Sequence, residues 1–299
     1  MEETNQLNFE GKHPRAKRYL NEVQLGQPPD TIMKEEKVGF NSEGTKLLAE
    51  ILGNDKVFSQ PKPSKLIEYL ISILPNNDSG IFLDFFSGSA TTAHAVMQLN
   101  AEDGGNRKFI MVQLPEPTAE NSEAAKAGYK NICEIGKERI RRAGEKIKAE
   151  AEGKAVDLDI GFKVFKLDSS NLRKWNPQPE DLQIALQESV ENFLPRRTEL
   201  DVVYEIILKM GLDLSLPVEE REAAGETVYI VGLGALMICL GDKITVEAAE
   251  EIARLHKEYD SELWQVVFRD NDFASDMDKT NIKETLKSAG LDEDSFVCV

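Results

Sequence analysis

The sequence has few of the residues that build metal sites, disulfide frameworks or membrane spans. Its 299 residues include three cysteines and three histidines, which are scattered instead of paired at ligand spacing. We therefore expect no metal site and no disulfide framework, and the cysteine usage fits a reducing cytoplasm. The sequence also has no run of about 18 apolar residues and no signal peptide, so we expect no membrane partner.

The glycine-rich motifs of common nucleotide sites are missing as well. No Gly-Lys-Ser/Thr follows a glycine turn, which excludes a P-loop, and the absence of G-x-G-x-x-G excludes the dinucleotide fingerprint. Four aspartates at 270, 272, 276 and 278 lack the spacing of a calcium loop. We interpret them as a solvated loop and a helix cap.

Acidic residues outnumber basic ones, with 53 Asp and Glu against 36 Lys and Arg. The formal net charge is −17, which argues against a chain whose main task is to grip DNA phosphates. Lysine and arginine do gather at residues 11–18 and on a helix over 137–148. A solvated helix face is the favoured interpretation of the second group. With 41% hydrophobic residues, the chain has the composition of a globular protein of about two domains.

The most informative stretch is residues 80–99. Residues 81–85 form a short apolar run that is typical of a buried strand. A turn of small residues follows, and a helix is predicted over 91–99 with Thr91 or Thr92 as its N-cap. Such a corner places ligands against a helix N-terminus in open α/β sheets. From these residues alone, an ordinary corner without a ligand is an equal alternative.

The corner and its flanks resemble the DNA amino-methyltransferases. Residues 84–92, DFFSGSATT, are similar to motif I, which binds S-adenosylmethionine, but Ala90 stands where the family usually has a second glycine. Alanine there is costly if φ is positive. Residues 61–71, with a helix starting at Pro63, resemble motif X. The strand over 109–114 resembles motif II, with Gln113 where the family has an acidic residue for the ribose. The order X, I, II is that of a permuted adenine methyltransferase.

Longer stretches resemble the modification subunits of type III restriction–modification systems. They lie at residues 92–118, 128–144, 161–175 and 278–281, so the resemblance covers essentially the whole chain. It implies adenine-N6 methylation of DNA with S-adenosyl-L-methionine as cofactor. The implied partners are DNA, through the complete enzyme, a restriction (Res) subunit, and a second modification subunit or a separate chain with the catalytic motif.

The family's catalytic motif, D-P-P-Y, is not found. Residues 27–30, QPPD, have the two prolines without the acidic and aromatic neighbours, and they lie too close to motif X. We therefore assign no catalytic residue and expect no methyltransferase activity from this chain alone. The resemblance implies a cofactor site in which Phe86 lies near the adenine and the backbone of Gly88 approaches the methionine part. Its expected members are Asp84, Phe86, Gly88, Thr91, Pro63 and Gln113.

The fold is expected to be α/β: part of a Rossmann-like methyltransferase sheet followed by a smaller α/β C-terminal domain. Expected regions are 1–56, the tail of a target-recognition region; 57–155, the cofactor-binding subdomain; and 156–299, an assembly domain. Further helices are predicted over 42–52 (capped by Ser42), 119–150, 200–210, 245–256 (capped by Thr245) and 278–288. Further strands are predicted over 162–167, 227–231, 235–240, 263–268 and 295–299.

Three hypotheses for the function stay open. The chain is a separate part of a split enzyme, an inactive truncated remnant, or a non-catalytic subunit that holds a restriction partner. His94, on the predicted helix after the turn, is interpreted as a packed or capping residue, since no nucleophile is placed beside it.

Overall fold

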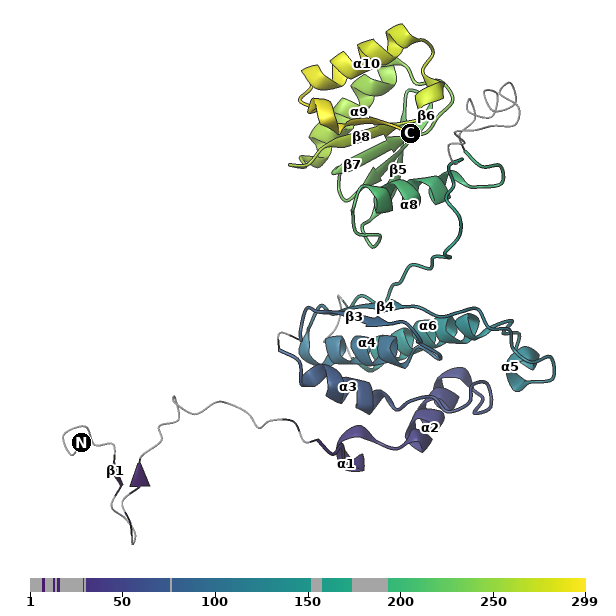
Figure 1. Ribbon diagram of the computed structural model, residues 1–299, viewed down its shortest axis with the longest axis vertical. Coiled ribbons are helices and arrows are strands. Elements are labelled where there is room, and N and C mark those ends of the chain that lie inside the picture. The colour runs from purple at the N-terminus through teal and green to yellow at the C-terminus, as the bar shows by residue number, and fades with distance from the viewer. Residues whose placement is uncertain are drawn as a thin grey trace, which may run out of the picture. The chain divides into compact units, whose positions relative to one another are not determined.

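The computed structural model divides the chain into two compact units, Met1–Gly161 and Phe162–Val299 (Figure 1). The structure describes residues 7–8, 13, 15–16, 29, 31–75, 77–151, 158–173 and 193–299. Most of the basic segment 11–18 and of the QPPD segment lies outside the described residues. At the N-terminal end, β1 (Leu7–Asn8) pairs antiparallel with β2 (Arg15–Ala16).

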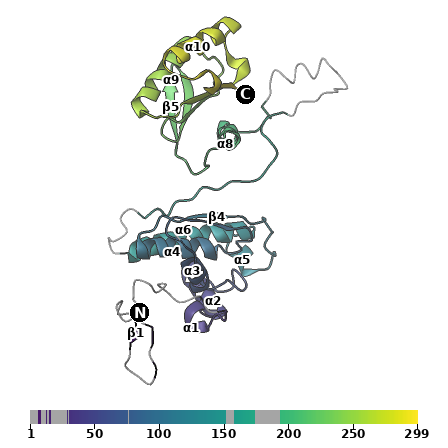
Figure 2. The same cartoon turned by 60° about the vertical axis from the view of Figure 1, so that its left-hand side comes forward.

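The centre of the first unit is a βαβ element. Strand β3 (Ile81–Asp84) runs parallel to β4 (Lys108–Met111), and helix α4 (Thr91–Asp103) connects them. Helix α4 packs on both strands, and α3 (Ser64–Ser72) and α6 (Ile132–Glu150) pack on α4. In both views these helices lie on one side of the strand pair (Figures 1 and 2).

The opposite face of the two strands is open. Six large apolar side chains on this face are between 48% and 63% exposed: Ile81, Leu83, Phe85, Ile110, Val112 and Leu114. The expectation of buried strands was therefore wrong for this chain. Residues apolar on both faces are typical of strands between two helix layers, and the described residues supply only one layer.

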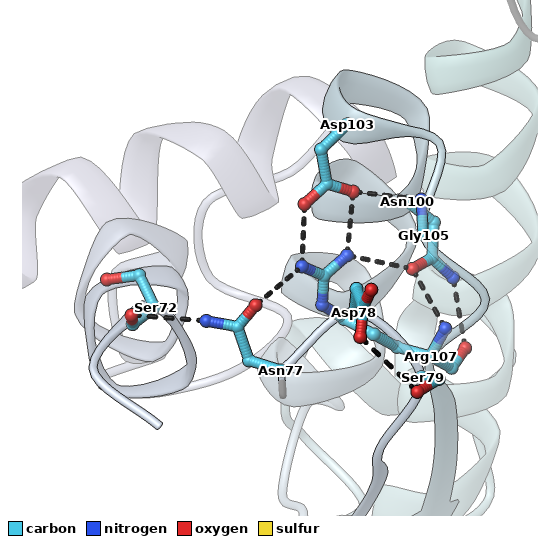
Figure 3. Close-up of polar contacts among 8 residues, drawn as sticks. All are labelled: Ser72, Asn77, Asp78, Ser79, Asn100, Asp103, Gly105 and Arg107. Carbon is cyan, nitrogen blue, oxygen red and sulfur yellow. Dashed lines mark hydrogen bonds and ion pairs between the residues drawn. The ribbon is translucent and has the colours of Figure 1, made fainter. Parts of the chain in front are cut away.

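Arginine 107 fixes the end of the βαβ element where β4 begins. Its guanidinium donates to both carboxylate oxygens of Asp103 at 2.8 and 2.6 Å, and also to the side-chain oxygens of Asn100 and Asn77 (Figure 3). The group is almost fully buried, so this paired charge ties the loop before β3 to the C-terminal end of α4. The other end of the element, where the strands finish, is left for a site.

Several helix boundaries differ from the sequence-based prediction. Helix α2 (Asn41–Leu52) has Phe40 at its N-cap instead of Ser42, and Gly53 follows its end in the left-handed conformation. The helix expected over 119–150 is two helices, α5 (Glu123–Lys126) and α6. Gly128 separates them at φ +90°, and the side chain of Asn131 then caps α6. The short α1 (Glu35–Val38) precedes α2.

The second unit is a three-layer α/β domain. Its sheet has the order β5-β6-β7-β8-β9: Val218–Ala223, Glu226–Val231, Leu236–Cys239, Gln265–Phe268 and Phe296–Cys298. The first three strands are antiparallel, and β7, β8 and β9 are parallel. Helices α9 (Val246–Tyr259) and α10 (Asp276–Ser288) pack on one face, and α8 (Glu199–Lys209) packs on the other.

Most predicted elements of this unit are confirmed, including the β6–β7 hairpin and the Thr245 cap of α9. Strand β5 was missed because its sequence, VEEREA, is mostly polar. The strand predicted over 162–167 is wrong, because this stretch pairs with no strand among the described residues. It is held by side chains instead: Lys163 donates to the carbonyls of Leu214 and Leu216.

Candidate functional site

The turn between β3 and α4 has an unusual backbone. Gly88 and Ala90 both adopt left-handed conformations, with φ of +50° and +59°. Ala90, not Thr91 or Thr92, is the N-cap of α4. An L-residue in this conformation costs about 1–2 kcal/mol relative to the right-handed one, which is the cost anticipated for an alanine in place of glycine. The methyl group is buried, so packing offsets part of it.

The carboxylate of Asp84 builds this turn. One oxygen accepts a hydrogen bond from the backbone N–H of Phe86 at 3.2 Å. The other accepts from the hydroxyl of Thr92, inside α4, at 2.7 Å. Both oxygens are thus engaged by the protein, which makes Asp84 a residue that shapes the turn.

Gln113 joins the end of β4 to the same turn. Its side-chain oxygen accepts from the backbone N–H of Gly88 at 2.8 Å, and the N–H of Ser87 donates to the carbonyl of Val112 at 3.2 Å. Gln113 follows the end of β4 by two residues, and these hydrogen bonds place it beside the turn. No contact in the structure tests its expected role at a ribose.

The segment before α3 borders the turn from another side. The hydroxyl of Thr91 donates to the carbonyl of Lys62 at 3.4 Å, and the buried Pro63 is the N-cap of α3, not its first residue. The ring of Phe58 lies 3.1 Å from the place where a Cβ on Gly88 would be. A side chain at position 88 would therefore press against this ring, which would have to give by a few tenths of an ångström. Sequence reasoning missed Phe58.

Phe86 extends away from the protein. Its ring is 75% exposed and makes a tilted contact with Phe85, with 5.3 Å between ring centroids. A mostly apolar groove of about 290 Å³ lies beside it, between α3 and β3. Its lining residues are Ile67, Leu70 and Ile71 of α3, Leu74 just after that helix, residues 82–86, and Thr92. Within the described parts of the chain, β3 pairs only with β4, so this groove follows its unpaired edge.

One residue beside the turn is buried, although the sequence analysis favoured a solvated position for it. Arg139 of α6 belongs to the basic group interpreted as a solvated face, but it is 0% exposed. It shares the buried stripe of α6 with Ile135, Gly136 and Ala143, so helical periodicity could have found it. A Cβ on Gly136 would lie 3.3 Å from the carbonyl oxygen of Gly88, so this glycine lets α6 approach the turn closely.

Arg139 binds both sides of the helix start. Its Nη1 donates to the hydroxyl of Ser89 at 2.9 Å and to that of Thr91 at 2.8 Å. Its Nη2 lies 3.4 Å from Nδ1 of His94. His94 is buried, and burial, with the charges of Arg139 and Lys146, lowers its pKa to about 3. A neutral, enclosed imidazole agrees with the packed role expected from the sequence.

Other candidate sites do not develop in the structure. Among the described residues, no group of three or more His, Cys, Asp or Glu side chains is placed to hold a metal ion. In the aspartate-rich segment, Asp278 accepts from the N-cap residue Ser275, and Asp270 pairs with Lys279. Among all the described residues, no helix is both long enough and apolar enough to cross a bilayer.

Comparison with known proteins gives the corner a family context. Residues 5–143 match the family model described as DNA methylase. The chain is 45% identical over 141 residues to the Mod subunit of the type III restriction-modification enzyme StyLTI of Salmonella typhimurium, an alignment covering 47% of this chain and 21% of that protein. The chain resembles type III modification subunits.

Two further relatives extend this similarity along the chain. The EcoP15I Mod subunit of Escherichia coli is 29% identical over 92% of this chain and 46% of its own length. The EcoPI Mod subunit of Escherichia phage P1 is 32% identical over 90% of this chain and 40% of its own length. The similarity therefore includes the second unit, and this chain spans less than half the length of each of these relatives.

Replacing Asp84 tests its role in the turn. In Asp84→Ala, the hydroxyl of Thr92 and the N–H of Phe86 lose their acceptor, so the free energy of unfolding should fall by about 1–3 kcal/mol. Urea denaturation measures this change. Glu116→Ala, which removes an exposed carboxylate, should change it by less than about 0.5 kcal/mol. Equal effects of the two substitutions would contradict the role given to Asp84.

The buried His94 should make stability pH-dependent. Its pKa is about 3 in the folded chain, against an ordinary value of 6.5, so below pH 6.5 the unfolded chain binds a proton that the folded chain refuses. Stability is therefore complete above pH 6.5 and falls toward pH 3, by up to about 1.4 kcal/mol per pH unit. Urea denaturation at pH 7, 6 and 5 should show a smaller decline in His94→Gln. Parallel declines would show that His94 titrates normally.

Proposed function

We propose that residues 57–155, which lie in the first unit, are the S-adenosylmethionine-binding part of a DNA adenine-N6 methyltransferase of the type III modification class. The observation that carries this proposal is the turn from Asp84 to Thr92. It joins a parallel strand to a helix N-terminus whose N–H groups favour anionic ligand groups, and it lies inside the region that matches the DNA methylase model. When bound, S-adenosylmethionine would supply the methyl group for transfer.

The geometry supports distinct roles for the expected site residues. The exposed ring of Phe86 is available to stack on the cofactor's adenine. Gly88 lies between the ring of Phe58, which fills the space beside its Cα, and the amide of Gln113, which accepts from its N–H, so it keeps the turn in a fixed position. Asp84 and Thr91 support the site from within, and Pro63 places the segment that borders it.

We further propose that another polypeptide segment carrying D-P-P-Y completes a Rossmann-like sheet on this unit. The support is the open apolar face of β3 and β4 and the groove along the unpaired edge of β3. Exposed apolar faces and free strand edges of this kind favour association. The three relatives have more than half of their length outside the region that this chain matches.

The remaining regions receive roles in the same enzyme. We propose residues 1–56 as the tail of a target-recognition region and residues 156–299 as an assembly domain for a Res subunit or a second modification subunit. The second unit has its own core on both faces of its sheet. DNA would be contacted through the completed enzyme in the cytoplasm.

A glycine pair tests the cofactor site. Gly88→Ala places a methyl group 3.1 Å from the ring of Phe58, whereas Gly104→Ala has nothing within 4 Å and a similar φ of +73°. Both substitutions carry the same backbone cost. We expect S-adenosylmethionine to bind the parent chain with a Kd in the micromolar range, roughly −8 kcal/mol, measured by calorimetry. Gly88→Ala should weaken it at least about tenfold and Gly104→Ala less than about twofold. Equal effects, or a folded parent that does not bind, would refute the assignment.

Completion of the sheet is tested by mixing. The part of the StyLTI Mod subunit that this chain does not match is added to the chain, and transfer of labelled methyl groups to duplex DNA is measured. Transfer should require both components. Leu83→Lys places a charge on the open face and should abolish transfer, while Leu263→Lys, at an equally exposed leucine of the second unit, should not. Transfer by the chain alone, or insensitivity to Leu83→Lys, would contradict completion at this face.

A further inference from the structure

Among the described residues, no carboxylate balances the charge of Arg139. Burial lowers its pKa to about 10, so the group stays protonated at neutral pH. Among the described residues, the guanidinium contacts hydroxyl, carbonyl and imidazole groups and no carboxylate. The acceptors on the guanidinium are the hydroxyl and carbonyl of Ser89 and the hydroxyl of Thr91, and its neighbour His94 is neutral. The Nε of Arg139, like that of Arg107, has no partner among the described residues.

Arg107 shows how this protein treats a buried arginine that serves the fold alone. Its side chain is also almost fully buried, but Asp103 receives it through two hydrogen bonds (Figure 3), and this pairing raises its pKa. An unpaired buried charge costs stability. Because the fold pairs Arg107 and leaves Arg139 without a carboxylate, a purely structural role does not explain the charge of Arg139.

The hydrogen bonds of Arg139 place its charge at the start of α4. Its hydrogen bonds go to Ser89 and Thr91, the residues on either side of the Ala90 N-cap of α4. The 13-residue helix α4 already has a partial positive charge at this end. The two positive contributions add at the turn. The carboxylate of Asp84 also lies there, but its two oxygens accept from Phe86 and Thr92, and the contacts of Arg139 go to Ser89, Thr91 and His94.

We propose that Arg139 is a positioning residue that acts through Ser89 and Thr91, and that its buried charge selects a ligand with a carboxylate next to the turn. This inference rests on the proposed function, in which the ligand is S-adenosylmethionine, whose methionine part ends in a carboxylate. Arg139 is too deeply buried to contact the ligand itself. It holds the two hydroxyl groups in place and supplies the potential behind them.

Two ligands that differ in the carboxylate test the inference. S-adenosylhomocysteine has the amino-acid carboxylate, and 5′-methylthioadenosine keeps the nucleoside and thioether but lacks it. Calorimetry gives both Kd values for the parent chain, Arg139→Met and Arg139→Lys. Arg139→Met should weaken S-adenosylhomocysteine by roughly tenfold more than 5′-methylthioadenosine, the size expected for one charge acting through a partly screened interior. Arg139→Lys keeps the charge and should keep the ratio of the two Kd values.

The outcomes separate this inference from the proposed function. A parent chain that binds neither ligand contradicts both. A parent chain that binds both, with equal losses in Arg139→Met, overturns the inference alone and leaves Arg139 a structural support. Methionine suits a buried site, since apolar replacements of buried ions are often tolerated. If Arg139→Met does not fold, Arg139→Gln is titrated in its place, and the same ratio decides the question.

Discussion

The structure of the first unit depends on the hydrogen bonds that hold the turn between β3 and α4. Asp84 links the end of the strand to the inside of the helix, Gln113 links the neighbouring strand to Gly88, and Arg139 reaches the turn from α6. Three separate elements thus fix one short segment that has two left-handed residues. Because its polar groups are held from within, the turn keeps one defined shape, with the start of α4 buried and Phe86 exposed beside it. In the proposed enzyme, the cofactor lies against this preorganised segment.

The open face of β3 and β4 is the second constraint on the molecule. A strand pair with large apolar side chains on both faces is built for the interior of a sheet, yet the described helices cover one face only. The open face and the turn without a catalytic group have the same explanation in the proposed enzyme. A further polypeptide segment would cover the face and bring the catalytic group to the turn. The high net negative charge fits this division of labour, because DNA phosphates then fall mainly to other parts of the enzyme.

The sequence predicts local features well and long-range features poorly. The β6–β7 hairpin and the cap of α9 followed from turn glycines and Thr245, because hairpins and caps depend on neighbouring residues. The resemblance directed attention to the turn over residues 84–92, and the structure places Gln113 against it. The burial of Arg139 was not predicted, because its acceptors lie about fifty residues away in the chain. The exposure of β3 was missed because an apolar strand reads the same whether or not its second layer is present.

Amide hydrogen exchange tests most directly whether S-adenosylmethionine binds at the turn between β3 and α4. Exchange is followed at residues 81–93 and at 113, with and without the cofactor, and β7 of the second unit serves as an internal reference. The account predicts slower exchange in the turn and the first residues of α4, with β7 unchanged. Cofactor-dependent protection confined to other segments, or none in a chain that stays folded, would contradict it.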